Sequence, residues 1–317
     1  MPVSVATAMP VERESVGTSG LRLAWWNTHL SPRRGNRLAT EAQWSLASRV
    51  ASQLIEAEQV DVLAVGEVTP DDMGRLRSSV SGNLALFRED EADVRLGMIY
   101  DRKKIAILDY RKLKTVYAGK SLSRGFEMAI GLLETNTLAY LFVMHWPSRI
   151  VARAVRERRA LGDDLRRRIQ EVQDEFGASI PILLLGDFND EPFDKSMSDA
   201  LCGSRDRTLV RRNSGLLYNP FWRWLGEQQT LAREYPVRLG AGTHFFRSDQ
   251  LTWWFTFDQA LVSSSLLGGN GWVLWEEGTG IWQSPLLLRD GRMIERFDHL
   301  PIVVTLVHES QSQETLP

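Results

Sequence analysis

The chain consists of short apolar runs separated by longer segments in which apolar residues recur every three or four positions. The runs at 60–68 and 181–187 are apolar without alternation, which is the pattern of strands buried on both faces. The segments 40–58 and 152–176 have the spacing of amphipathic helices. Gly177 is placed to cap the second helix at its C-terminus.

Further strands are predicted where apolar, β-branched and aromatic residues cluster between turn-forming residues. Two of these strands should form a hairpin turned at Asn136. The pattern weakens over about 203–242, which indicates a long excursion with a short helix, and 268–292 indicates a strand plus a mobile loop. The further strands are expected at 21–30, 84–90, 95–101, 104–110, 126–135, 138–146, 242–246, 253–263 and 296–307.

Strands followed by helices occur in both halves of the sequence, so we expect an α/β fold in which two sheets pack together and helices cover them outside. No fixed-period repeat and no linker divides the sequence. We therefore expect one domain over 21–308, preceded by a disordered leader at 1–20 and followed by a flexible tail at 309–317.

Composition narrows the class of protein only slightly. Of the 317 residues, 43% are apolar and 25% are charged, as in ordinary globular proteins. The net charge of −2 neither favours nor excludes a nucleic-acid partner. The single cysteine, Cys202, excludes an internal disulfide, and the sequence has no signal-peptide pattern and no apolar run of membrane-spanning length. We expect a cytoplasmic protein.

Polar residues recur at the ends of the apolar runs or just beyond them. One such Asn or Asp is ordinarily a turn former, and one His is ordinarily a hydrogen-bonded structural residue. A set of this size in one chain instead indicates a shared task. The set comprises Asn27, Glu67, His145, Asp187, Asn189, Asp258, Asp298 and His299.

The residue types suggest phosphate chemistry. Glu67 and Asp298 offer the oxygen ligands that Mg²⁺ prefers, and the sequence has no Cys/His cluster with zinc spacing. An Asp and a His can form a dyad in which the acid fixes the imidazole tautomer. A metal that neutralises phosphoryl oxygens and a base that positions water would complete the set.

Six segments resemble, in order, the motifs of the endonuclease/exonuclease/phosphatase superfamily, whose members include DNase I-like nucleases, apurinic endonucleases, sphingomyelinases and inositol polyphosphate 5-phosphatases. The segments are WNTHL, DVLAVGEV, HWPSR, GDFNDEP, TFDQALVS and FDHLPIVV, within about 21–307. The resemblance implies a four-layer α/β sandwich, with two packed mixed β-sheets flanked by helices. It also implies a phosphoesterase that depends on Mg²⁺ or Mn²⁺.

The resemblance assigns metal and phosphate contacts to four residues. Glu67 matches the metal-binding glutamate, and Asp298 matches the acid of the last motif, near the metal. Asn27 matches the asparagine that helps to hold metal and phosphate. Asn189 matches the asparagine that donates to the scissile phosphate.

Four residues match catalytic positions of the superfamily. Asp187 matches the aspartate that orients or deprotonates the attacking water, and it points into the same cleft as Asn189 because the two lie two positions apart on an extended strand end. His299 matches the catalytic histidine and Asp258 its orienting acid. His145 matches the second histidine of the DNase I-like and sphingomyelinase-like branches.

The sequence departs from the superfamily pattern at three places. Gly66 stands where many members have Gln, and Phe297 replaces the common Ser before Asp298. Thr28 and His29 stand where some members have an acid, so the resemblance leaves a second metal position open.

Arginines near these motifs have two interpretations each. Arg149 follows His145 closely and could clamp a phosphate bidentately, or it could belong to a solvent-facing turn set by Pro147. The arginines of 152–176 alternate with acids, which favours a solvated outer face over a nucleic-acid track. They are Arg153, Arg156, Arg158, Arg159, Arg166, Arg167 and Arg168.

Three functions remain open from the sequence. The first is a metal-dependent nuclease acting on DNA or RNA, with aromatic and Arg-rich loops to stack on bases and grip phosphates. The second is a phosphatase or phosphodiesterase acting on a small-molecule or lipid-headgroup phosphate, which the near-neutral charge favours. The third is a silent binding module on the same fold, which the complete set of catalytic positions argues against.

Overall fold

The structure is a computed structural model. It describes residues 20–32, 39–88, 95–149, 154–226, 228–230, 237–239, 242–269, 271–289, 291–294 and 297–309, with only the backbone at 123–124, 228–230 and 237–239. The first and last strands of the fold reach Gly20 and Glu309. The rest of the predicted leader and tail lies outside the described residues.

The first sheet contains seven strands in the order β16-β20-β1-β2-β4-β3, with β17 also paired to β20. Its central strands β1 and β2 are parallel, and the other pairs are antiparallel. The strands are β1 (Gly20–Asn27), β2 (Val62–Gly66), β3 (Leu84–Arg88), β4 (Leu96–Asp101), β16 (Gly271–Leu274), β17 (Gly280–Ile281) and β20 (Ile302–Glu309).

The second sheet has the order β5-β6-β7-β8-β15-β10-β9, and in it β7 and β8 are parallel. Three two-stranded hairpins stand outside both sheets: β11-β12, β13-β14 and β18-β19. The strands are β5 (Ile105–Tyr117), β6 (Lys120–Leu132), β7 (Thr137–His145), β8 (Ile182–Asp187), β9 (Gly203–Ser204), β10 (Leu217–Tyr218), β15 (Asp258–Val262), β11 (Gln228–Thr230), β12 (Val237–Leu239), β13 (His244–Phe245), β14 (Trp254–Phe255), β18 (Leu288–Arg289) and β19 (Arg292–Met293).

The helices begin where the sequence supplies capping residues. Thr40 and Thr69 each form a capping box at the start of a helix, which satisfies backbone N–H groups that have no partner within the helix. The helices are α1 (Glu41–Ser52) continued by the π-helical turn η1 (Gln53–Ala57), α2 (Pro70–Ser78), α3 (Ala154–Phe176), η2 (Ser196–Ala200), α4 (Arg207–Arg212), η3 (Pro220–Trp224) and η4 (Ser264–Leu266).

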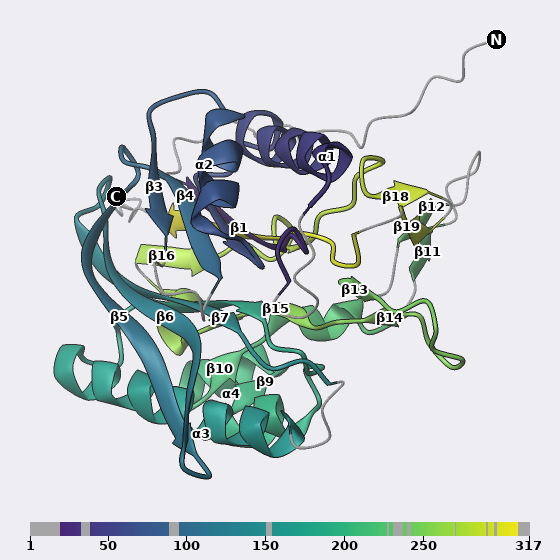
Figure 1. The fold of residues 1–317 in the computed structure, drawn as a ribbon. Helices are drawn as coiled ribbons and strands as arrows, with labels where there is room; N and C mark the ends of the chain where they lie inside the picture. The colour runs from purple at the N-terminus through teal and green to yellow at the C-terminus, as the bar shows by residue number, and fades with distance from the viewer. Residues whose placement is uncertain are drawn as a thin grey trace.

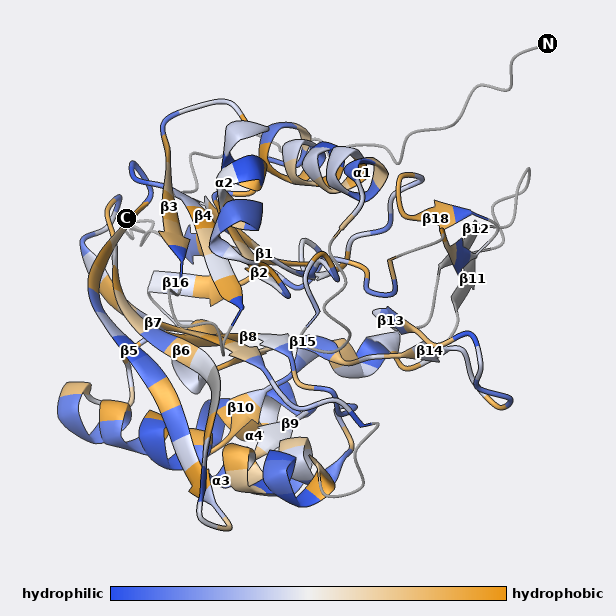
Figure 2. Ribbon diagram, viewed as in Figure 1, coloured by the Kyte–Doolittle hydropathy of each residue, from blue (hydrophilic) through white to orange (hydrophobic). Residues whose placement is uncertain are grey.

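The elements form four layers (Figure 1). Helices α1 and α2 cover the outer face of the first sheet, and α3 covers the outer face of the second. One apolar core lies between the sheets and one lies under each helical layer. Figure 2 shows that α3 alternates apolar and polar residues around its surface, as a helix with one buried face must. The predicted α/β sandwich of two mixed sheets flanked by helices is confirmed.

Three sequence predictions need correction. The strands expected at 104–110 and 126–135 are longer than predicted, because β5 and β6 continue through residues 111–125 as a long hairpin with two irregularities in register. The strand expected over 296–307 begins only at Ile302. On α3, Arg158 is buried rather than solvated, since its Nε lies 2.7 Å from Asp190 Oδ2. Arg153 lies outside the described residues.

Other expectations agree with the structure. The hairpin of β6 and β7 turns at Asn136, whose φ is 52°. Gly177 ends α3 with a φ of 90°, and its N–H donates to Gln173 O. None of the helices in the described ranges has the length and apolar character needed to cross a membrane.

Candidate active site

The predicted site residues converge because neighbouring strands of the two sheets end or begin at one edge of the sandwich. Asn27 ends β1 in register with Gly66, and His145 ends β7 in register with Asp187, the last residue of β8. Asp258 pairs with Asp187 but is the first residue of its strand. The expectation that every site residue follows a strand is therefore wrong for Asp258 and for the residues before β20. These strands run antiparallel to their neighbours, so their beginnings reach the same edge.

Two glycines allow the close packing beneath this edge. A Cβ on Gly186, whose φ is 154°, would lie 2.0 Å from Met144 O in the adjacent strand. A Cβ on Gly66 would lie 2.7 Å from the indole of Trp25. The departure at Gly66 thus has a structural reason: the indole occupies the space that a side chain would need. A second departure, Phe297, packs in the core against Trp26 with ring centroids 5.5 Å apart.

The carboxylate of Asp187 lies at the centre of the site and is 1% exposed. Its Oδ2 accepts a hydrogen bond from Asn27 Nδ2 at 3.1 Å. The Nε2 atoms of His145 and His299 each lie 3.8 Å from the same oxygen. Its Oδ1 accepts the backbone N–H of Asn189 at 2.8 Å. Three polar side chains therefore converge on one carboxylate oxygen.

Asp258 and His299 form the predicted dyad. His299 Nδ1 lies 2.7 Å from Asp258 Oδ2, and both side chains are buried. Asp258 Oδ1 accepts a hydrogen bond from Trp25 Nε1 at 2.7 Å, and its backbone N–H donates to Thr243 Oγ1 at 2.9 Å. The acid is thus fixed on both sides, and it holds the imidazole with Nε2 directed at Asp187.

Glu67 and Asp298 meet at His29. The His29 Nδ1 atom lies 3.2 Å from Glu67 Oε2 and 3.5 Å from Asp298 Oδ1. Both carboxylate oxygens are buried without a hydrogen bond of normal geometry. Asn27 stands beside them, because it pairs with the residue before Glu67. Unsatisfied carboxylate oxygens beside a carboxamide oxygen are the donor set that a hard divalent cation requires, so these residues fit the implied metal.

Backbone strain accompanies the site. His29, Glu67 and Asn189 have φ values of 50°, 57° and 53°, a region that non-glycine residues adopt at a cost. Such strain is concentrated at functional sites, where the surrounding structure over-determines the conformation. These three side chains are therefore held in the site by backbone conformations that are unfavourable for the residues themselves.

The pKa values of three site residues are shifted from their ordinary values, and not all in the same direction. Burial, reinforced by the charge of Asp258, raises the pKa of Asp187 to about 7. Burial opposes the charged form of Glu67, but the close contact with His29 Nδ1, at 3.2 Å, and the charge of His145 outweigh it and lower the pKa of Glu67 to about 2. Burial also opposes protonation of His299, yet the charges of Asp258 and Asp187 raise its pKa to about 10. Groups with separated pKa values are typical of acid–base sites.

Sequence reasoning missed His29 and His244 as members of this cluster. His244 lies with its ring centroid 4.5 Å from that of His299, and its Nε2 lies 4.0 Å from Asp298 Oδ2. Burial and the neighbouring charge of His299 lower the pKa of His244 well below 6.5. Only five histidines occur in the sequence. Four of them gather here, so their scarcity together with their strand-end positions was the available signal.

Arg149 lies at the rim of the site. Its guanidinium makes ion pairs with Asp190, at 3.2 Å, and with Asp194. Its Nε donates to Asn189 O at 3.0 Å, and its Cζ lies 4.7 Å from the ring centroid of Phe257. These contacts fix the backbone of Asn189, and a phosphate clamp at Arg149 stays a prediction.

Asp190 forms an ion pair with a buried arginine of α3. Its carboxylate lies 2.7 Å from Arg158 Nε and accepts a hydrogen bond from Ser196 Oγ at 2.5 Å. Because Arg158 is 1% exposed, Asp190→Ala would leave a buried guanidinium without its counter-charge. We expect the free energy of unfolding to fall by about 3–5 kcal/mol, measured by urea denaturation.

The matched control for this variant is Asp174→Ala, on the exposed face of α3. The control should change the free energy of unfolding by less than about 0.5 kcal/mol. Equal stability of Asp190→Ala and the wild-type protein would show that Asp190 does not stabilise Arg158.

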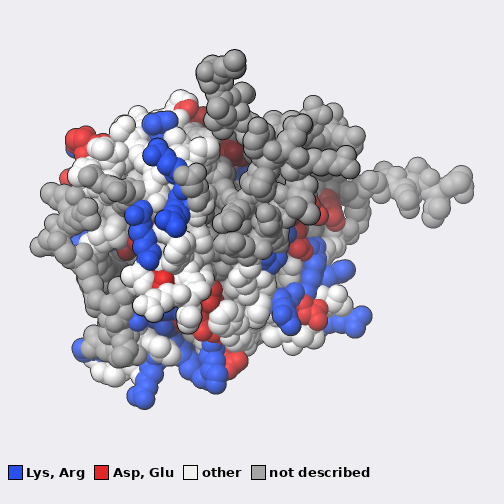
Figure 3. Space-filling view, turned by 90° about the vertical axis from the view of Figure 1, so that its right-hand side faces the viewer, with Lys and Arg blue, Asp and Glu red and all other residues white. Residues whose placement is uncertain are grey.

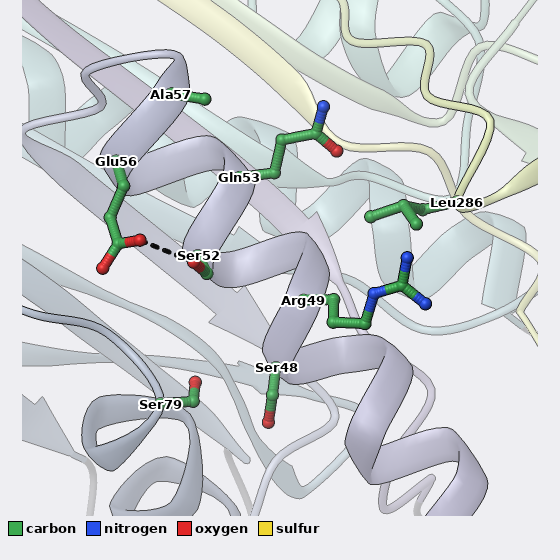
Figure 4. A pocket seen from close by; sticks show the side chains of 8 residues that line it. All are labelled: Ser48, Arg49, Ser52, Gln53, Glu56, Ala57, Ser79 and Leu286. Atoms are coloured by element: carbon green, nitrogen blue, oxygen red, sulfur yellow. Dashed lines mark hydrogen bonds between the residues drawn. The ribbon is translucent and has the colours of Figure 1, made fainter.

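A hollow elsewhere in the molecule has no part in this site (Figure 4). It has a volume of about 430 Å³ and lies along α1 and η1. Its one carboxylate, that of Glu56, accepts hydrogen bonds from Ser52 and Ser81 at 2.7 Å. None of the predicted site residues lines it.

The fold is that of the DNase I-like class, whose members are phosphoesterase hydrolases. A family model described as the Endonuclease/Exonuclease/phosphatase family matches residues 49–293. The chain belongs to this family, whose members generally use a divalent metal. No curated protein sequence gives a significant match.

The solved structures that are similar in fold include the following three. The catalytic domain of human Nocturnin with bound sulfate has a TM-score of 0.59 at 17% identity, covering 92% of this chain and 95% of that one. The mannosyl-6-phosphatase of Bacteroides thetaiotaomicron VPI-5482 has 0.57 at 16%, covering 90% and 99%. TDP2 of D. rerio, complexed with a single-stranded DNA product, has 0.55 at 16%, covering 91% and 99%. At these identities the similarity shows the shared fold.

Proposed function

We propose that the protein hydrolyses phosphodiester bonds in nucleic acid, DNA or RNA, by metal-assisted in-line attack of water. The observation that carries the proposal is the convergence of Asn27, His145 and His299 on one oxygen of Asp187. A carboxylate surrounded by donors in this way can orient water and accept its proton. The nucleic acid in the TDP2 structure supports, by analogy of fold, a polymer as substrate.

The role of Asp187 in this mechanism is to position the attacking water and take its proton. His299, held by Asp258, presents a protonated Nε2 to the charge that develops on the phosphoryl group. His145 faces the same oxygen of Asp187 and assists as a second cationic or proton-donating group. Asn189 uses one N–H of its amide on Trp146 O, at 3.0 Å, and an amide has a second N–H for phosphate.

Glu67 and Asp298 would hold the divalent metal, Mg²⁺ or Mn²⁺, with Asn27 contributing its carboxamide oxygen. The metal supplies charge neutralisation at the phosphoryl oxygens. Asn27 and Asn189, with Arg149 at the rim, would contact the substrate. This assignment gives Asp187 no metal to hold, so that its carboxylate can act on the attacking water.

Metal removal provides the first test. Because two carboxylates and one amide hold a hard cation weakly, we expect a chelator to abolish turnover and added Mg²⁺ or Mn²⁺ to restore it. The measurement is the rate of hydrolysis of bis-p-nitrophenyl phosphate before and after exhaustive chelation. Full activity in the chelated protein would contradict the proposal.

A second candidate is a phosphatase or phosphodiesterase that acts on a small-molecule or lipid-headgroup phosphate. The net charge of −2 favours it, since a polyanion-binding protein is often basic overall. Turnover of inositol phosphates together with inactivity towards plasmid DNA, single-stranded DNA and RNA would select this candidate over the nuclease.

A further inference from the structure

A hollow of about 790 Å³ lies between the hairpins β13-β14 and β18-β19. The two hairpins are joined directly: Arg247 Nη2 donates to Met293 O at 2.8 Å, and Trp254 Nε1 donates to Gly291 O at 3.3 Å. Figure 1 shows both hairpins on the same side of the sandwich, and Figure 3 views that side and shows Lys and Arg side chains exposed on it. The hollow is lined by Phe245, Arg247, Trp253, Arg289, Arg292, Met293 and Ile294.

The three arginines of this hollow are exposed to solvent. Within the described residues, no carboxylate lies at ion-pair distance from Arg247, Arg289 or Arg292. Arg289 and Arg292 pair in register across the β18-β19 hairpin, so their side chains leave the same face of it, and both line the hollow. Two adjacent guanidinium groups form a site for an anion, and their planar forks suit the oxygens of a phosphate.

Aromatic rings accompany the arginines. Trp253 is 44% exposed, and the guanidinium carbon of Arg292 lies 4.7 Å from its ring centroid. The ring of Phe245 lies 6.1 Å from that of Trp253, and Arg247 Cζ lies 5.9 Å from the Phe245 ring. A partly exposed indole beside stacked guanidinium groups is a platform for a flat ring as well as for an anion.

The hollow adjoins the catalytic cluster. Phe245 follows His244, whose ring faces His299, and Phe245 N donates to Asp298 O at 2.7 Å. Successive residues of a strand point to opposite faces, so the β13-β14 hairpin stands between the hollow and the cluster. A ligand long enough to pass around this hairpin reaches both, whereas a small one occupies the hollow alone.

We infer that the hollow is a nucleotide subsite, in which Arg289 and Arg292 bind a phosphate and Trp253 stacks on the attached base. The inference rests on the proposed function, because it takes the occupant to be a nucleotide of the same substrate, outside the scissile bond. The volume is within the range of pockets that hold a ligand of this size. A polymer and a free nucleotide share this chemistry, and the test separates them.

The test measures binding of a fluorescein-labelled 12-nucleotide single-stranded DNA to the full chain by fluorescence anisotropy, with Mg²⁺ present. The protein carries Asp187→Asn so that the probe stays intact, which a gel confirms after the titration. Adding Arg289→Ala and Arg292→Ala should raise the Kd by about 10- to 100-fold at low salt. It should also flatten the plot of log Kd against log salt by about 0.7, the change expected for one phosphate that is no longer neutralised.

Two further variants separate binding from structural damage. Trp253→Ala should raise the Kd by about 5- to 100-fold without changing the salt slope, because stacking involves no counterion release. The control, Arg102→Ala with Lys103→Ala, removes the same charge at exposed positions in the turn after β4, at the other end of the sheet. It should alter the Kd by less than about twofold, because that turn lies beyond the screening length.

Competition identifies the occupant. AMP should displace the probe, and orthophosphate at the same concentration should not. Much tighter binding of the 12-mer than of AMP would identify the polymer as the source, and equal binding would identify the free nucleotide. An unchanged Kd and salt slope after loss of both arginines, undetectable probe binding, or competition by orthophosphate equal to that by AMP would overturn the inference. Failure of the proposed function would appear separately, as a wild-type protein that binds the probe and hydrolyses nothing.

Discussion

Replacing Asp187 with asparagine should lower kcat by about 10²–10⁴-fold, the range expected when a general base is removed. The amide is nearly isosteric with the carboxylate, and its one carbonyl oxygen can still accept one of the two hydrogen bonds, from Asn27 Nδ2 or from the backbone N–H of Asn189. It cannot accept a proton from water, and it presents less negative charge to His145 and His299. The measurement is steady-state hydrolysis of bis-p-nitrophenyl phosphate at saturating Mg²⁺.

A stability measurement distinguishes this loss from unfolding. The folded pKa of Asp187 is raised to about 7 by burial and by the charge of Asp258, so the unfolded chain ionises first as the pH rises. The folded metal-free protein therefore loses stability from this group between about pH 4 and pH 7. Asparagine cannot ionise, so Asp187→Asn should match the wild-type protein near pH 3 and exceed its free energy of unfolding at pH 8. A variant that unfolds while its remaining folded molecules keep full activity would make Asp187 a structural cap.

The dyad carries the second large effect. His299→Ala and Asp258→Asn should each lower kcat by about 10²–10⁴-fold. The imidazole of His299 is oriented for catalysis only while Asp258 Oδ2 lies 2.7 Å from its Nδ1. The double variant should be little worse than the worse single variant, since groups that act as one unit show non-additive losses. The measurement is a complete double-mutant cycle in kcat.

His308→Ala is a matched control for the dyad. This histidine packs against Trp272, with ring centroids 5.5 Å apart. It lies near the C-terminal end of β20, whereas the site lies at the beginning of that strand. Its removal should leave kcat within about twofold, as expected of a substitution remote from the reacting groups. Strictly additive losses in the cycle would show that Asp258 and His299 act independently.

Much of the site could be predicted because its residues stand in short local patterns at strand ends. Asn27, Glu67 and Asp187 each follow an apolar run directly. The sandwich then places these ends together, because parallel pairs such as β1-β2 and β7-β8 end at the same edge. Local sequence patterns and the strand topology were therefore sufficient to predict that these residues lie close together.

Other features depend on contacts between distant segments, which the sequence pattern does not contain. Arg158 belongs to an arginine-rich helix, and only the approach of Asp190 explains its burial. His244 joins the cluster because β13 forms a bridge to His299. Residues 111–125 contain many exposed polar positions, since the long β5-β6 hairpin extends along the edge of the sandwich where half of its surface meets solvent. Such a strand resembles a loop in composition.

The most direct test of the central claim, that the cluster around Asp187 hydrolyses phosphoester bonds, is a comparison of wild-type and Asp187→Asn protein on one substrate panel. The panel contains bis-p-nitrophenyl phosphate, single-stranded DNA, plasmid DNA, RNA and inositol phosphates, each with Mg²⁺ and with Mn²⁺. We predict turnover of at least one nucleic acid by the wild-type protein and a loss of about 10²-fold or more in the variant. Equal rates for the two proteins, or no hydrolysis of any substrate by the folded wild-type protein, would contradict the claim.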